Sequence, residues 1–418
     1  MELPLKNVRI TDITQVGAGP MAMSIFAHFG AEVIHVESLR RLDPSRISGG
    51  RLEGAASPGE RPWNRSAGFN YTNVNKLGIT LDLTTDDGRN LFKALIKISD
   101  AVAENFRPGV MERFGLGYEE LREINPAIIM LSMPIFGSTG PESGYRGYGL
   151  GVEMISGMVN LTGYQGGHPM KSGIHHGDAV EAAHGASALL AALWYRSKTG
   201  TGQHIDCASN EANLCIIGEY ILDFAMNGQE RPRMGNRHHS MAPHGCYRCQ
   251  GEDKWVTIAI ASDREWQQFC GAIGHPDLAV DARFSTIVAR KRNEDALDEI
   301  VSEWTAGFDP HTVTEILQVA GIAAGPVLDI REILDNPHLK ERGFFQKVNH
   351  PEVGEVTCDL VRAKLSKTPG RVRIPAPCLG EHNKYVFQEL LGLSDQEFAH
   401  LEEKGIIGSV PLGQRASK

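Results

Sequence analysis

The 418-residue sequence lacks any apolar run long enough to cross a bilayer, and it lacks the basic start and apolar stretch of a secretory signal. It has no excess of basic residues either: 51 Asp and Glu outnumber 42 Lys and Arg, and the formal net charge of −9 argues against nucleic-acid binding. Cysteine is scarce, seven in all and none before Cys207, which is typical of free thiols in a reducing cytoplasm. We therefore expect a cytoplasmic protein with neither a membrane nor a nucleic acid as partner.

One cysteine pair has the spacing of half a zinc site, Cys246-Tyr-Arg-Cys249, but no second pair of matching spacing follows. A mixed site would have to draw on three nearby histidines: His238, His239 and His244. The pattern better fits a β-hairpin in which this segment pairs with residues 255–260 through a turn at 250–253. We therefore expect no metal ion.

Strand and helix patterns alternate in the first part of the chain, which predicts a doubly wound, Rossmann-like α/β domain. The expected strands are residues 8–13, 32–36, 75–83, 100–104 and 126–132, and the expected helices include 21–28 and 86–97. The first strand is followed by the glycine-rich segment Gln15-Val-Gly-Ala-Gly-Pro20. A glycine-rich loop that opens a helix can hold a phosphate.

The same loop also suggests a dinucleotide-binding oxidoreductase. The third glycine of the G-x-G-x-x-G fingerprint is replaced by Ala22, a substitution found in some dinucleotide-binding proteins. Glu37 ends the second strand, where a ribose-binding acid would lie. A nicotinamide-dependent Rossmann enzyme is therefore an open alternative.

The character of the sequence changes near residue 218, which predicts two domains. Residues 1–215 and 330–418 are expected to form the large domain, 225–325 a smaller inserted α+β domain, and 216–224 and 326–329 the linkers. Residues 321–327 are interpreted as the return path, and the tail 408–418 is expected to be disordered. No internal repeat is present.

Asp178 lies where a polar, glycine-containing loop, residues 171–178, meets an Ala- and Leu-rich helix predicted at 179–198 and ended by 199–203. An aspartate at this position is explained by N-capping alone, without any chemistry. Gly177 before it leaves room for a large substrate to approach the backbone. The position by itself therefore favours an N-cap role, and a chemical role for Asp178 needs support from the rest of the sequence.

Several segments, in order and over nearly the whole chain, resemble class III CoA-transferases, the family of formyl-CoA transferase and carnitine CoA-transferase. They are 12–20, 29–37, Asn75-Lys76 with 81–83, 104–109, 136–141, Gly177-Asp178, 196–203, 325–327 and 379–382. No single segment is specific, but chance does not supply all of them in sequence. The resemblance implies that Asp178 is a covalent nucleophile. It also implies an intertwined dimer, of identical or homologous chains.

The chemistry implied for Asp178 is attack of its carboxylate on an acyl-CoA thioester, which keeps the thioester energy in an enzyme-bound intermediate. A helix N-terminus favours the carboxylate anion and could stabilise a developing oxyanion. Water must be excluded, because the anhydride would hydrolyse. The residues expected around the substrate and oxyanion are Gln15, Gly17, Tyr148, His175, His176 and Gly177.

Coenzyme A is expected as a substrate rather than as a tightly bound cofactor, together with a free carboxylic acid. The resemblance places Arg40 and Arg41 at its nucleotide. It places Lys76, Asn105, Phe106 and Arg113 along its binding site. Each could instead be a solvated charge or a core residue, but as a set at successive strand ends they fit the ligand edge of a parallel sheet.

The chain departs from formyl-CoA transferase in the first loop, where Gln15 and Gly17 replace a histidine and a glutamine. The family's tyrosine–glutamate pair is replaced within Tyr148-Gly-Leu-Gly151, where no acid lies, and the glycine-rich lid has no counterpart near residues 233–244. These departures disfavour formate and oxalate. They favour a larger acid, such as the dicarboxylate of succinyl-CoA. Histidines that could help to hold it are His175, His176, His238, His239 and His244.

The related α-methylacyl-CoA racemases would need a histidine within residues 144–157, and this segment offers only Tyr148, whose ordinary pKa near 10 makes it a poor base at neutral pH. A racemase or isomerase is therefore the second interpretation. A chemically silent partner subunit is disfavoured by the presence of Asp178.

Overall fold

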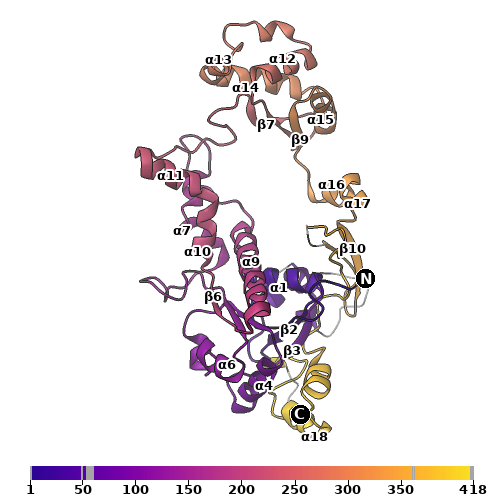
Figure 1. Ribbon diagram of the computed structural model, residues 1–418. Helices are drawn as coiled ribbons and strands as arrows, with labels where there is room; N and C mark the ends of the chain where they lie inside the picture. Colours follow the sequence, from indigo (N-terminus) through magenta and orange to yellow (C-terminus); the bar gives the residue numbers. More distant parts are fainter. Residues whose placement is uncertain (1, 49, 53–60, 360, 362, 415–418) are drawn as a thin grey trace. The chain divides into compact units, whose positions relative to one another are not determined.

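The computed structural model describes residues 2–48, 50–52, 61–359, 361 and 363–414. The chain divides into two compact units (Figure 1). The first comprises residues 1–159, 171–229 and 340–418, and the second comprises 160–170 and 230–339. Residues 160–170 thus join the second unit, whereas the sequence analysis assigned them to the large domain. The proposed linker 216–224 is mostly a helix of the first unit, α11 (Gly218–Asn227).

The first unit is built on a six-stranded parallel sheet with the strand order β3-β2-β1-β4-β5-β6. Its strands are β1 (Arg9–Asp12), β2 (Glu32–Glu37), β3 (Leu77–Thr80), β4 (Ala101–Glu104), β5 (Ile129–Ser132) and β6 (His204–Asp206). In register, Thr11 lies opposite Ile34 on one side and Val102 on the other. This order is that of the doubly wound fold, so the predicted α/β class is confirmed. Ligands in such sheets bind at the carboxyl ends of the strands.

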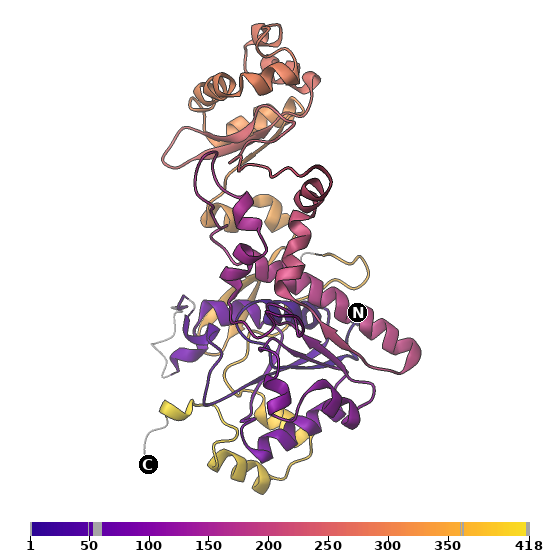
Figure 2. The same ribbon diagram turned by 90° about the vertical axis from the view of Figure 1, so that its left-hand side faces the viewer.

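Helices cover both faces of the sheet, and each face has its own apolar core (Figures 1 and 2). On one face, α1 (Ala18–His28) packs along α9 (His176–Thr199) over Val33, Leu131 and their neighbours. On the other face, α4 (Asp86–Lys97), α6 (Tyr118–Ile124) and the C-terminal helix α18 (Asp395–Glu403) cover Ile34 and Met130. Adjacent strand residues such as Val33 and Ile34 enter opposite cores, as expected for strands that are buried on both sides.

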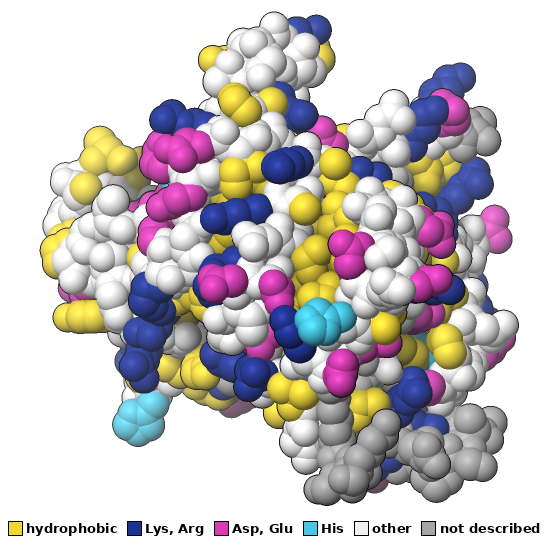
Figure 3. Space-filling model, turned by 90° about the horizontal axis from the view of Figure 1, so that it is seen from below, with side chains coloured by type: hydrophobic (Ala, Val, Ile, Leu, Met, Phe, Trp, Pro, Cys, Tyr) yellow, Lys and Arg dark blue, Asp and Glu magenta, His cyan; other side chains and the backbone are white. Residues whose placement is uncertain are grey.

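Shorter elements complete the first unit. They are α2 (Ser45–Ser48), α3 (Ala67–Thr72), α5 (Val110–Arg113), α7 (Gly149–Ile155), α8 (Met158–Leu161), α10 (Ser209–Leu214), the hairpin β10 (Phe345–His350) with β11 (Gly354–Asp359), and a π-helix at Tyr385–Leu390. Among the described residues no helix combines the length and apolarity needed to span a membrane. Acidic and basic side chains are interspersed on the face seen in Figure 3.

Helix α9 starts three residues earlier than the sequence predicted. Its alanine- and leucine-rich sequence favours the helix, and Gly200 ends it in the left-handed conformation, with φ of 74°. The N-cap residue is His175, so Asp178 is the third residue of the helix and not its cap; no side-chain cap hydrogen bond is present. Capping therefore does not explain Asp178. By contrast, α4 spans the predicted residues 86–97, with Thr85 accepting from Gly88 N–H as its cap.

The second unit contains a three-stranded antiparallel sheet of β7 (His244–Arg248), β8 (Trp255–Ala259) and β9 (Ala323–Pro326). The hairpin predicted around Cys246 is confirmed, whereas the predicted return path 321–327 contains strand β9, paired with β8. Helices surround a core that includes the fully buried Trp266 and Phe269. They are α12 (Asp263–Ala272), α13 (Ile287–Arg292), α14 (Glu294–Thr305) and α15 (Pro310–Val319). Helices α16 (Ile330–Asp335) and α17 (Pro337–Glu341) follow β9 outside this core, and α17 crosses into the first unit at residue 340.

The expectation of a disordered tail was wrong for residues 408–414. The Gly408 carbonyl accepts from Thr80 Oγ1 at 2.6 Å and from Asn383 Nδ2 at 3.2 Å, and residues 412–414 form a 3₁₀ turn. These hydrogen bonds fasten the tail to the end of β3. Residues 415–418 lie outside the described part of the chain.

Candidate active site

A cavity of about 710 Å³ opens at the carboxyl ends of the parallel strands, within the first unit. Every strand of the sheet is followed by a segment that lines it, from Gln15 after β1 to Ser209 after β6. Its volume lies in the range of about 300–1,000 Å³ typical of small-molecule sites. The fold therefore places the cavity where a doubly wound sheet binds its ligand.

The Asp178 carboxylate in this cavity is enclosed between two glycines. A Cβ atom added to Gly17 would lie 2.2 Å from Asp178 Oδ2, and one added to Gly149 would lie 2.1 Å from Oδ1. Both glycines belong to helix starts: Gly17 is the N-cap residue of α1 and Gly149 is the first residue of α7. Three helix N-termini, those of α1, α7 and α9, therefore meet at this carboxylate. Any side chain at either glycine would displace it.

The electrostatic surroundings of Asp178 do not resemble those of a structural carboxylate. The residue is buried, and no hydrogen bond to its carboxylate occurs among the described residues; the nearest cation is His175 Nδ1, 3.8 Å from Oδ2. Burial raises the pKa of Asp178 above its usual value, His175 opposes this rise, and Glu153 adds to it. A buried carboxylate without donors would be costly in a purely structural role. It is therefore available to a ligand.

Two further acids lie beside Asp178, and sequence reasoning missed both. Glu153, on α7, is buried and accepts from Ser172 Oγ at 2.8 Å and from Ser172 N–H at 3.1 Å. It lies two residues beyond the Tyr148–Gly151 segment in which no acid was expected. Glu181, one turn after Asp178 on α9, lines the cavity, and burial raises its pKa to about 8. The spacing of three residues on a predicted helix was the signal that could have identified Glu181.

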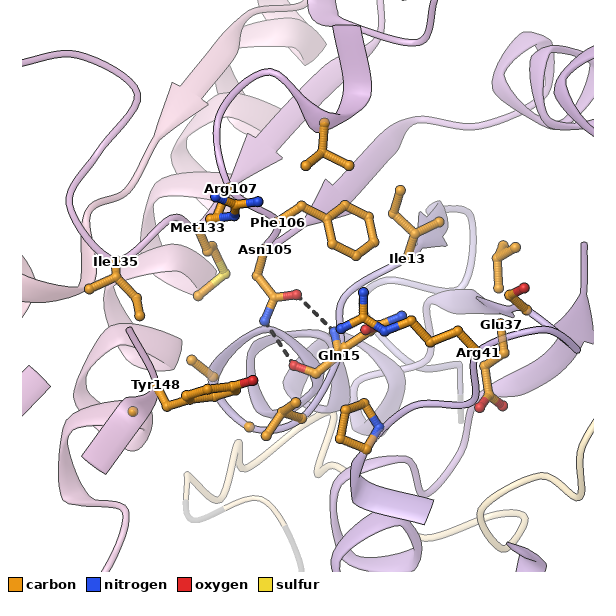
Figure 4. A pocket seen from close by; sticks show the side chains of 18 of the residues that line it. Ile13, Gln15, Glu37, Arg41, Asn105, Phe106, Arg107, Met133, Ile135 and Tyr148 are labelled. Carbon is orange, nitrogen blue, oxygen red and sulfur yellow. Dashed lines mark hydrogen bonds between the residues drawn. The ribbon is translucent and has the colours of Figure 1, made fainter. Parts of the chain in front are cut away.

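The loop after β1 is clamped by Asn105, which follows β4 (Figure 4). The Gln15 N–H donates to Asn105 Oδ1 and Asn105 Nδ2 donates to the Gln15 carbonyl, both at 2.8 Å. The next residue, Val16, has φ of 70°, which is strained for a β-branched residue, and its N–H donates to Asp43. These bonds hold the loop that carries Gly17 against Asp178. Asn105 and Gln15, which the sequence analysis assigned separately to the CoA site and to the substrate, are thus in contact.

Cations line the outer part of the cavity. Arg40 pairs with Asp82, whereas four other arginines on the lining, all exposed, have no ion-pair partner within the described residues. These four are Arg41, Arg107, Arg113 and Arg146. The sequence analysis named Arg41 and Arg113; it passed over Arg107, although Arg107 stands in the quoted segment 104–109, and it had no signal for Arg146. Unpaired guanidinium groups suit phosphate and carboxylate ligands.

Two residues expected at the ligand are engaged in buried ion pairs instead. Lys76, predicted to contact coenzyme A, is fully buried, does not line the cavity, and donates to Asp12 Oδ2 at 2.9 Å and to the Pro20 carbonyl at 3.0 Å. Glu37, the residue that suggested ribose binding, has both oxygens engaged by the buried Arg46 at 2.7–3.0 Å. Lys76 therefore has no surface to offer a nucleotide, whereas Glu37 lines the cavity with its charge balanced by Arg46.

The remaining predicted residues divide between the cavity and its surroundings. Tyr148, Phe106, Gly17 and Gln15 line it, while His175, His176 and Gly177 do not. His175 is exposed on the far side of Asp178 Oδ2, and the Gly177 carbonyl accepts from Asn213 Nδ2 at 3.2 Å. The other three histidines, His238, His239 and His244, belong to the second unit.

Comparison with known proteins gives matches over nearly the whole chain. The model of CoA-transferase family III matches residues 5–383. A succinyl-CoA–D-citramalate CoA-transferase of Chloroflexus aurantiacus is 35% identical over 404 residues, 97% of this chain and 98% of that protein. The β subunit of a succinyl-CoA–L-malate CoA-transferase of the same organism is 32% identical over 408 residues, 97% and 98% of the two chains.

A solved structure shares the fold as well. The crystal structure of a CAIB/BAIF family protein from Brucella suis aligns with a TM-score of 0.84 and 30% sequence identity, covering 93% of this chain and 100% of that one.

Proposed function

The chain belongs to CoA-transferase family III and is a CoA-transferase, and from this premise we propose that Asp178 carries the transfer as a covalent nucleophile. The observation that supports this role most strongly is the enclosure of its carboxylate. The carboxylate lies in the cavity between Gly17 and Gly149, and no described residue donates a hydrogen bond to it. A group held this way is free to bond to a substrate atom.

The proposed reaction has four steps. An Asp178 oxygen attacks the thioester carbonyl carbon of the donor, the C–S bond breaks, and a mixed anhydride and CoA thiolate result. The thiolate attacks the Asp178 carbonyl carbon, which releases the donor acid and leaves an aspartyl-CoA thioester. The acceptor carboxylate then attacks this carbon and expels the thiolate. Attack of the thiolate on the acceptor's acyl carbon gives the new CoA thioester and restores Asp178.

The helix termini around Asp178 suit the charges that develop in these steps. Each attack forms an oxyanion, and the starts of α1, α7 and α9 meet at this carboxylate. The positive end of a helix stabilises a nearby anion by about 0.3–1 kcal/mol at exposed sites and by more where water is excluded. Burial raises the pKa of Asp178, which increases the basicity of the anion but requires that it be ionised before it attacks.

For the substrates we propose a dicarboxylate thioester such as succinyl-CoA as donor and a second carboxylic acid as acceptor. The names of the two Chloroflexus relatives give succinyl-CoA as a substrate. The unpaired arginines at the cavity provide cations for the CoA phosphates and for a second carboxylate. Lys76 has no part in this proposal. CoA enters as a substrate and leaves as a product, so no resident cofactor is required.

The assembly is proposed as a dimer, as the family resemblance implied. One relative is named a β subunit, so a partner of the same sequence and a homologous partner are both retained. The Rossmann oxidoreductase alternative is replaced because the chain matches CoA-transferase family III, and the Glu37 carboxylate that suggested it is paired with Arg46. A racemase is retained only as an outcome of the experiment.

The test is intact-mass analysis of the protein after mixing with succinyl-CoA, acetyl-CoA or formyl-CoA, with and without hydroxylamine. A CoA-sized adduct that maps to Asp178, disappears with hydroxylamine and is absent from Asp178→Asn is expected, strongest with succinyl-CoA. Asp395→Asn is the matched control, because Asp395 is also in the first turn of a helix but outside the cavity. Exchange of an α-proton with deuterated water, without any adduct, would replace the proposal by a racemase.

A further inference from the structure

Glu181 is a second acid on the cavity wall, and covalent transfer at Asp178 does not use it. It lies three residues after Asp178 on α9, and its side chain is buried. Residues three apart on a helix are neighbours, with about 5–6 Å between their Cβ atoms. A group attached to Asp178 therefore lies within hydrogen-bonding reach of Glu181.

One oxygen of this carboxyl has no partner. Glu181 Oε1 is buried without a hydrogen bond, while its carboxyl interacts with the Ser209 hydroxyl at the start of α10. An unpartnered ionised oxygen in such a place would cost several kcal/mol, whereas a neutral carboxylic acid carries a proton that it can donate. The Glu181 side chain lines the cavity that holds Asp178.

Among the described residues, the helices and strands packed against α9 place no cation beside Glu181. The elements packed against α9 contribute Glu153 from α7 and the exposed Glu211 from α10, while β5 has no titratable residue and α1 has only His28 at its far end. Its interacting titratable neighbours are Asp178 itself and the Cys207 thiol. A negative charge on any of these acidic neighbours disfavours the ionisation of Glu181.

We propose that Glu181 is a second catalytic carboxyl, which remains protonated and donates a hydrogen bond to the acyl oxygen of the group bound to Asp178. This inference rests on the proposed covalent role of Asp178. The neutral acid avoids a second negative charge beside Asp178 and stabilises the oxyanion formed at each attack. It also keeps a general base away from the anhydride, so that water is not activated.

The pH dependence of the reaction follows from this role. Burial, aided by the charge of Asp178, raises the pKa of Glu181 to about 8. Below this value the donor proton is present, and above it the proton is lost and a second negative charge faces the nucleophile. Activity therefore falls on the alkaline side through the ionisation of Glu181.

The experiment compares wild type, Glu181→Gln and Glu181→Leu for kcat and KM with succinyl-CoA from pH 6 to pH 9.5. Glutamine keeps a donor that cannot ionise, so we expect activity at pH 7 within about tenfold of wild type and no alkaline fall. Leucine removes the donor, and the loss of one oxyanion donor lowers kcat by about 10²-fold. Glu211→Gln is the control, because it removes an exposed acid from α10 and leaves the cavity unchanged.

Two results would overturn the inference: an unchanged alkaline fall in Glu181→Gln, or a folded Glu181→Leu with wild-type kcat. If Glu181→Leu does not fold, the pH profile of Glu181→Gln decides alone. Intact-mass analysis separates this inference from the proposed function. A wild-type enzyme with no adduct on Asp178 refutes both, whereas an adduct together with unchanged Glu181 variants refutes only the role of Glu181.

Discussion

Two groups of ionisable side chains in the first unit differ in whether their charges are paired. The closed cluster consists of Asp12, His35 and Lys76, all fully buried, with Lys76 and His35 bonded to one oxygen of Asp12 and Thr14 bonded to the other. The open cluster consists of Asp178 and Glu181, which face the cavity. Lys76 and His35 hold the pKa of Asp12 well below its usual range despite its burial, whereas burial raises the pKa values of Asp178 and Glu181.

The contrast separates residues that build the site from residues that act in it. In the closed cluster, each buried charge is compensated by a partner. The cluster therefore fixes the loop that follows β1, and its charges are not available to bind a ligand. In the open cluster the compensation is missing, and a substrate has to supply it. Perturbed carboxyls without partners in a cavity are candidates for chemistry, whereas equally perturbed but paired ones are structural.

Lys76→Met gives the largest expected effect and tests the closed cluster. It leaves the Asp12 carboxylate buried with only His35 and Thr14 as partners, so the free energy of unfolding should fall by about 3–5 kcal/mol. Chemical denaturation measures the loss, with the exposed Lys97→Met as control. In the folded fraction, KM for the CoA substrate should stay within a factor of three. A stable variant with a greatly increased KM would restore Lys76 to the CoA site.

Gly149→Ala tests whether the Asp178 carboxylate needs its enclosure. The new methyl carbon would lie 2.1 Å from Oδ1 in the present position, so the carboxylate must move. A displacement of about 1 Å can cost about 10²-fold in kcat/KM. Steady-state transfer with succinyl-CoA measures it, and Gly151→Ala on the same helix is the control, since no atom lies within 4 Å of its added carbon. Equal activity of the two variants would show that Asp178 is not held by Gly149.

Much of the architecture could be predicted because it follows from local patterns. The βα alternation, the 86–97 helix and the hairpin at Cys246 each depend on residues close in the chain. The family resemblance brought Asp178, Gln15 and Asn105 to attention, and these do lie together at the cavity.

What could not be predicted depends on tertiary pairing. Lys76 immediately precedes β3 and Glu37 ends β2, and only the contacts with Asp12 and Arg46 show that both charges are paired within the protein. Likewise, the three-residue spacing places Glu181 on the same helix face as Asp178, but only the structure shows that its side chain is buried, interacts with Ser209 and lines the cavity. The proximity of Gly149 to Asp178 involves residues 29 positions apart in the sequence.

Glu181→Gln tests the open cluster through the pH dependence of stability. The pKa of Glu181 is about 8 in the folded protein and near the ordinary value of about 4.3 when unfolded. Between these values the unfolded chain releases a proton that the folded chain retains, so this residue's contribution is favourable at low pH and declines as pH rises. The slope approaches about 1.4 kcal/mol per pH unit.

Removal of that slope should make Glu181→Gln progressively more stable relative to wild type as pH rises, by about 2 kcal/mol between pH 5.5 and pH 7.5. Denaturation at several pH values measures the difference, with Glu211→Gln expected to follow wild type. A constant offset between Glu181→Gln and wild type would show that Glu181 is already ionised throughout this range and belongs with the paired acids.

The smallest expected effect extends the comparison of paired and unpaired charges to the arginines. Arg40 is paired with Asp82, whereas its neighbour Arg41 has no ion-pair partner among the described residues and lines the same cavity. If Arg41 binds a CoA phosphate, Arg41→Gln removes a charge-assisted hydrogen bond worth about 1.5 kcal/mol, so KM for the CoA substrate should rise about tenfold while kcat stays constant. Added salt should raise the KM of the wild type towards that of the variant, because salt screens exposed charges. Arg122→Gln, which removes an exposed charge of α6 outside the cavity, is the control. A change in kcat rather than in KM would place Arg41 at the reacting atoms instead of at the nucleotide.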